Sequence, residues 1–68
     1  MTIKRLASEC DEGPCPTVWG IAESENVLVQ GFKVDDEEAL ATMRLPDNET
    51  VVRVPMSLLL RVAREHFA

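Results

Sequence analysis

The sequence predicts an α+β domain, with a three-stranded, mainly antiparallel sheet, a short helix after its second strand, and a C-terminal helix packed on one face. Three observations predict this fold. Short valine-rich runs are separated by turn residues, an acidic segment at residues 35–38 is typical of a helix start, and apolar residues recur at helical spacing over residues 55–67. At 68 residues, the chain has room for a single domain, residues 1–68.

The N-terminal part predicts one strand and leaves one segment ambiguous. Residues 1–9 fit either a short strand or an extended arm. Residues 10–16 must form a loop, because one glycine and two prolines fall within seven positions. The first predicted strand follows as Thr17–Ala22, with Trp19 and Ile21 on one face.

A polar gap of hairpin length, residues 23–26, leads to the second predicted strand, Val27–Val34. Apolar residues occur at alternating and at adjacent positions in this strand, so neither of its faces should be fully solvated. Gly31 inside the strand indicates either a bulge or a close approach of another backbone segment.

The acidic run then predicts a short helix over residues 36–43, capped by Asp35 with Glu38 three positions later. Leu45–Asn48 ends this helix and turns the chain. The third predicted strand is Glu49–Val54, and Pro55 stands at the favoured first position of the final helix, about Pro55–Phe67.

The final helix has more apolar surface than one sheet can cover. A wheel at about 100° per residue groups a core stripe on one side: Met56, Leu59, Leu60, Ala63 and Phe67. Leu58 and Val62 fall on the flank of that stripe, and we expect them to need a second protein surface. The predicted protein interface is therefore Leu58, Arg61, Val62 and Phe67, and self-association through the Leu58/Val62 flank as a homodimer is one way to cover it.

Few residues suit catalysis or metal binding. Cys10, Cys15 and His66 give three ligands at a spacing slightly long for zinc, which normally takes four. A Cys–His pair for nucleophilic catalysis would need a third group to orient the histidine, and none is evident. The acidic run at residues 35–38 lacks the alternating ligands and the central glycine of a calcium-binding loop. We expect no enzyme activity and no metal or other cofactor.

Charge and hydropathy indicate a cytoplasmic protein that does not bind DNA by itself. The net charge is −5, which repels phosphate backbones, although the last part of the chain is basic. No signal peptide and no apolar run of transmembrane length is visible. In a reducing compartment, Cys10 and Cys15 are expected to be free thiols.

The segment Thr50–Val62 resembles the strand and first helix of ribbon-helix-helix repressors. In that family a dimeric two-stranded ribbon enters the major groove, and alternate strand residues read bases. The resemblance implies that Arg53 would be the base-reading residue. The family also needs a second helix, which these residues do not provide, so a strand leading to a C-terminal helix is the preferred interpretation.

Three stretches together resemble another group: residues 15–19 (CPTVW), 29–35 (VQGFKVD) and 49–55 (ETVVRVP) followed by Leu58-Leu59. They are similar to short actinobacterial proteins of unknown function encoded beside helix-turn-helix transcriptional regulators. The resemblance implies a protein-binding accessory factor that modulates such a regulator, as one half of a toxin–antitoxin-like pair. The alternatives are a small DNA-binding repressor and an acidic mimic of DNA that blocks a basic regulator surface.

Overall fold

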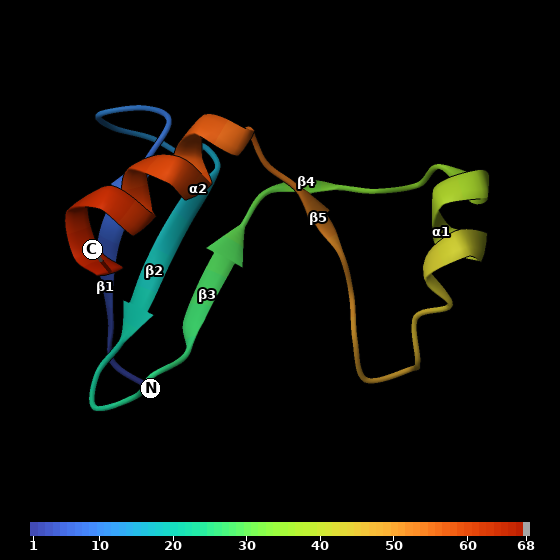
Figure 1. Cartoon of the computed structure of the whole chain (residues 1–68), viewed down its shortest axis with the longest axis horizontal. Coiled ribbons are helices and arrows are strands. Elements are labelled where there is room, and N and C mark those ends of the chain that lie inside the picture. Colours follow the sequence, from blue (N-terminus) through green and yellow to red (C-terminus); the bar gives the residue numbers. More distant parts are fainter. Residues whose placement is uncertain (68) are drawn as a thin grey trace.

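The computed structural model describes residues 1–67 and has the predicted α+β architecture (Figure 1). A three-stranded antiparallel sheet in the order β1-β2-β3 is covered on one face by a C-terminal helix. Its elements are β1 (Ile3–Ser8), β2 (Thr17–Ile21), β3 (Val27–Gln30), helix α2 (Met56–Val62) and the π-helical turn η1 (Ala63–Phe67) that continues it.

The third strand of this sheet comes from the N-terminus. Of the two interpretations of residues 1–9, the strand is confirmed, because β1 pairs antiparallel with β2 along its length, with one irregularity between Arg5 and Ala7. The segment predicted as the third strand, Glu49–Val54, lies outside the main sheet. It contributes only β5 (Val52–Arg53), which pairs with β4 (Phe32–Lys33) in a separate two-stranded ribbon.

The predicted strand Val27–Val34 is divided at Gly31, where two segments of the chain nearly touch. A Cβ atom at Gly31 would lie 2.6 Å from the Val54 Cγ1 atom and 2.7 Å from the Arg53 carbonyl oxygen. This confirms the prediction of a close backbone approach at this glycine. The chain leaves the sheet here after β3 and returns here before α2, so a bulkier residue would force the two segments apart.

Between these two crossings the chain forms an excursion, residues 31–55, which we call the arm. It carries helix α1 (Glu37–Met43), within one residue of the predicted helix. The cap is Asp36, not Asp35 as predicted: its carboxylate accepts a hydrogen bond from the Ala39 N–H at 2.9 Å. None of the α1 residues is buried, and Figure 1 shows α1 standing well away from the sheet.

The core is very small. Within residues 1–67, four hydrophobic side chains are buried, and they form one cluster between the sheet and α2: Ala7, Val18, Leu58 and Val62. Leu6 and Val54 pack against it while partly exposed. Val54 thereby ties the base of the arm to the core.

The chain leaves more surface exposed than a compact protein of its size. Its accessible surface is 5714 Å², against roughly 4,300 Å² for a compact monomer of equal mass. Its radius of gyration is 13.3 Å, against about 11 Å for a compact 68-residue domain. Many large apolar side chains are therefore exposed.

Candidate protein-binding surface

Helix α2 is rotated relative to the prediction: the apolar residues expected to be exposed are buried, and those expected to be buried are exposed. Leu58 and Val62, predicted as the exposed flank, are 0% and 3% exposed and lie at the centre of the core. They are one turn apart, so both side chains point to the same side of the helix. The prediction that these two residues need a second protein surface is wrong, because the sheet of the same chain covers them.

Two polar contacts with β1 accompany this rotation of the helix. The Arg61 guanidinium donates a hydrogen bond to the Ser8 carbonyl oxygen, and the His66 Nε2 atom lies 3.0 Å from the Leu6 carbonyl oxygen. Both contacts lie along β1, at the residues that precede and follow the core residue Ala7. The small Ala7 side chain lets the helix come close to the sheet, where the Leu58 and Val62 side chains fill the space.

The predicted core stripe is instead the exposed side of the helix. We define the apolar stripe as Met56, Leu59, Leu60 and Phe67, which are 82%, 50%, 55% and 63% exposed. The spacing of Met56, Leu59 and Leu60 places them on one side of α2, and Ala63 between them and Phe67 is also exposed. Of the four predicted interface residues, only Arg61 and Phe67 are exposed, and Arg61 is held by the Ser8 carbonyl.

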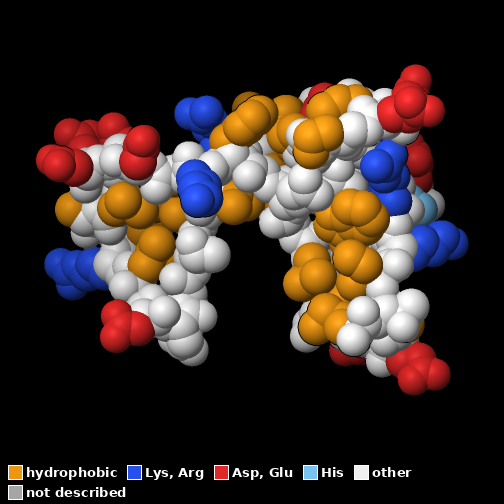
Figure 2. Space-filling view, turned by 180° about the vertical axis from the view of Figure 1, so that it is seen from behind, with side chains coloured by type: hydrophobic (Ala, Val, Ile, Leu, Met, Phe, Trp, Pro, Cys, Tyr) orange, Lys and Arg blue, Asp and Glu red, His pale blue; other side chains and the backbone are white. Residues whose placement is uncertain are grey.

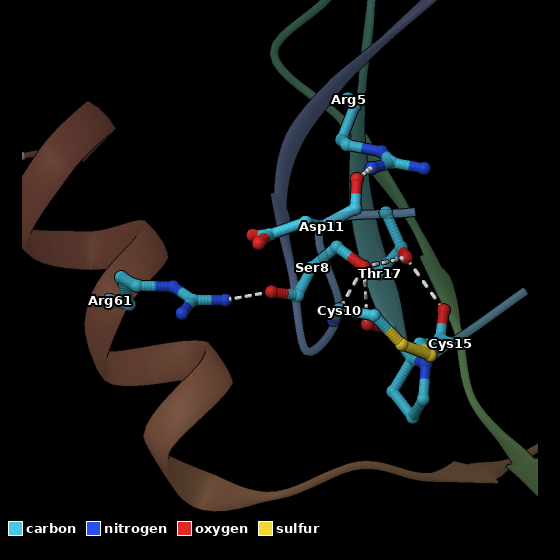
Figure 3. Close-up of a disulfide and its surroundings, with 8 residues drawn as sticks. Arg5, Ser8, Cys10, Asp11, Cys15, Thr17 and Arg61 are labelled. Carbon is cyan, nitrogen blue, oxygen red and sulfur yellow. Dashed lines mark hydrogen bonds between the residues drawn. A yellow bond between two sulfur atoms is a disulfide. The ribbon is translucent and has the colours of Figure 1, made fainter. Parts of the chain in front are cut away.

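The loop between β1 and β2 is closed by a disulfide. Cys10 and Cys15 are bonded to each other, with Cα atoms 5.9 Å apart, which is within the usual range for a disulfide (Figure 3). The expectation of free thiols is therefore wrong for this structure. That expectation came from the compartment alone, whereas the loop geometry brings the two residues together: the Glu9 N–H donates to the Pro16 carbonyl oxygen at 3.0 Å across the loop base.

A small hydrogen-bond network stabilises the base of this loop, where it joins β1 and β2. The buried Thr17 hydroxyl lies 2.9 Å from the Ser8 hydroxyl and 2.6 Å from the Cys15 carbonyl oxygen. Because the Ser8 carbonyl also accepts from Arg61, the disulfide loop, the start of β2 and helix α2 are joined through one residue, as Figure 3 shows. The spacing of the two cysteines around Gly13 and Pro14 was the sequence signal for this closure.

Arg53, the predicted base-reading residue, is exposed on β5, with its guanidinium 5.6 Å from the centre of the Phe32 ring. In a ribbon-helix-helix dimer the corresponding strand pairs with its copy in a second chain. Here β5 pairs with β4 of its own chain through Phe32 and Lys33. Strand β5 is thus already paired with another strand of the same chain. Base reading by Arg53 stays a prediction.

Over residues 1–67, no group of three or more His, Cys, Asp or Glu side chains is placed to hold a metal ion. A shallow hollow of about 350 Å³ at one end of β1 and β2 is lined without any acid, histidine or cysteine. Within the same residues, none of the helices has the length and apolar character needed to cross a bilayer.

Comparisons of the chain with protein-family models, curated proteins and solved structures found no match. The functional argument therefore depends on the surfaces of this molecule.

Proposed function

We propose that this chain is a non-catalytic protein-binding accessory factor, which docks the apolar stripe of α2 on a helix-turn-helix transcriptional regulator and modulates it. One observation carries the proposal. The stripe lies on a helix whose other side already forms the core through Leu58 and Val62, so the sheet cannot also cover it. A surface outside this chain is required to bury it.

The stripe has the pattern of a helix that binds in a groove. Such helices present anchors at positions i, i+3, i+4 and i+7, which Met56, Leu59, Leu60 and Ala63 match. Burying a large apolar side chain completely stabilises a complex by about 1.5–3 kcal/mol. These side chains start roughly half exposed or more, so the stripe as a whole supplies several kcal/mol.

The charges beside the stripe indicate what the rim of the groove should be. Arg64 is exposed on η1, about one turn after Arg61 of α2. The acidic residue nearest to these two arginines on the same helix is Glu65. A groove with an apolar floor and a mainly acidic rim would complement this arrangement.

The regulator as the partner follows from the resemblance of residues 10–62 to the small proteins encoded beside such regulators. On this proposal the two proteins form a toxin–antitoxin-like pair, and the chain acts in the cytoplasm, where the regulator meets DNA and where the Cys10–Cys15 disulfide is exposed to reduction. Direct DNA binding is not proposed beside it, because Arg53 lies on a strand paired within its own chain.

The test is a binding titration of the purified chain against the purified regulator encoded beside it, followed by calorimetry. Leu60→Glu places a charge on the stripe and should weaken binding at least tenfold. Met43→Glu is the matched control, since Met43 is also an exposed apolar residue on a helix, but on the arm; it should bind as the wild type does. Equal affinity of the two variants, or no binding by the wild type, would contradict the proposal.

A further inference from the structure

The disulfide loop, residues 10–15, can be reached by a small reductant. Cys10 and Cys15 are each partly exposed, and the residues between them, 11–14, are all exposed. Exposed disulfides exchange readily with thiols, whereas structural ones resist reduction. The bond between Cys10 and Cys15 is therefore open to reversible reduction.

Both ends of this loop are connected to helix α2 through one residue, Ser8 (Figure 3). The Ser8 hydroxyl lies 3.4 Å from the Cys10 backbone nitrogen and 2.9 Å from the Thr17 hydroxyl. The Thr17 hydroxyl in turn contacts the Cys15 carbonyl oxygen, and the Ser8 carbonyl oxygen accepts the hydrogen bond of Arg61 on α2. A loop that is closed by the disulfide holds Ser8 in place, and Ser8 contacts the helix.

Helix α2 is held against the sheet by a small core. It supplies Leu58 and Val62, two of the four hydrophobic side chains that are buried within residues 1–67. On the opposite face of the sheet Leu28 is 39% exposed, and Figure 2 shows hydrophobic side chains open to solvent on that face. The folded chain thus exposes 5714 Å², about half of the roughly 11,000 Å² of its unfolded form, whereas a compact domain of this length exposes about 40%.

The disulfide contributes a large share of the stability of such a structure. Closing a loop of this length restricts the unfolded chain and raises the ratio of folded to unfolded molecules by about 30-fold. A chain that buries so little surface has a small total stability. Reduction therefore increases the fraction of molecules in which α2 has left the sheet.

We propose that the Cys10–Cys15 pair is a redox switch for helix α2. While the bond is intact, α2 is docked and presents the apolar stripe in one fixed orientation. After reduction, α2 leaves the sheet more often, and binding through the stripe weakens. The effect on binding rests on the proposed function, whereas the release of α2 does not.

The reductant is a cellular dithiol, and the reaction is thiol–disulfide exchange. One thiolate of the reductant attacks a sulfur of the Cys10–Cys15 bond and forms a mixed disulfide, while the other cysteine leaves as a thiolate. The second thiol of the reductant then attacks the mixed disulfide and releases the remaining cysteine. Two electrons pass to the protein, the two protons of the reductant end on Cys10 and Cys15, and the reductant becomes a disulfide. A small-molecule disulfide reverses the reaction and is itself reduced to two thiols.

The first test is amide hydrogen exchange, followed by NMR with and without dithiothreitol. Exchange of the Val62 amide in α2 should be about 30-fold faster after reduction. The Arg44 amide, which donates to the Leu40 carbonyl oxygen of α1 on the arm, is the internal control and should keep its rate. Oxidised glutathione should restore the slow rate at Val62. An unchanged Val62 rate, or faster exchange confined to the Cys15 amide in the loop, would overturn the proposal.

The second test is a binding titration with the regulator encoded beside the chain, in which the oxidised wild type is compared with the Cys10→Ser/Cys15→Ser protein. The serine protein should bind more weakly, by a few-fold to about 30-fold, and its Val62 exchange should not respond to dithiothreitol. Equal affinities would overturn the switch and leave the proposed function standing. No binding by the oxidised wild type would contradict the proposed function, and the Val62 exchange rate would still decide whether reduction releases α2.

Discussion

Leu58 and Leu60 stand two positions apart on one helix and have opposite roles. Leu58 is completely buried in a core that, among the residues described, has four hydrophobic side chains, whereas Leu60 is more than half exposed on the apolar stripe. With so few buried residues, each core side chain accounts for a large share of the stability, which is marginal in any chain of this length.

Leu58→Ala should lower the free energy of unfolding by about 2–5 kcal/mol, because it leaves a cavity in the centre of the core. Leu60→Ala, an exposed position, should change it by less than about 0.5 kcal/mol. Urea unfolding of both variants at one protein concentration measures the difference. Similar losses in the two variants would mean that the helix is rotated relative to the orientation described above.

At the scale of elements, the disulfide loop connects β1 and β2 and is tied to α2 through Ser8. A covalent closure here mainly restricts the unfolded chain, since the loop base is already held by backbone and hydroxyl hydrogen bonds. Loss of the bond should therefore weaken the fold without changing its topology.

Reduction of Cys10–Cys15 should lower the free energy of unfolding by about 2 kcal/mol, as expected for closure of so short a loop. The measurement is urea unfolding with and without dithiothreitol. The Cys10→Ser/Cys15→Ser protein serves as the control and should match the reduced wild type and show no response to the reductant. A wild type that is equally stable in both conditions would contradict this account.

The sequence predicted the elements better than their partners. The helix at α1, the strand at β2 and the close backbone approach at Gly31 were predicted correctly, although the cap of α1 is Asp36 and not Asp35. The pairing of residues 49–54 was wrong, because which strand joins which sheet depends on contacts distant in sequence. On α2 two arcs are apolar, and periodicity cannot say which arc faces inward. In the structure Leu58 and Val62 face the sheet, and Arg61 and His66 contact β1 beside them.

At the scale of the whole molecule, a compact lobe and a projecting arm share one small core (Figure 1). Most of the large apolar side chains are at least partly exposed, over the α2 stripe, β3 and α1. A molecule built in this way gains stability from association, since the surface that folding leaves open is covered by binding.

The antiparallel pairing of Lys33 with Val52 closes the arm at its base. Residues 34–51 are thus an insertion whose two ends already meet, and a two-residue turn could join Lys33 to Val52 as an ordinary hairpin. Lengthening or deleting such an insertion costs little loop entropy and leaves the four core residues in place. A change of length in this segment should therefore leave the sheet and its covering helix intact.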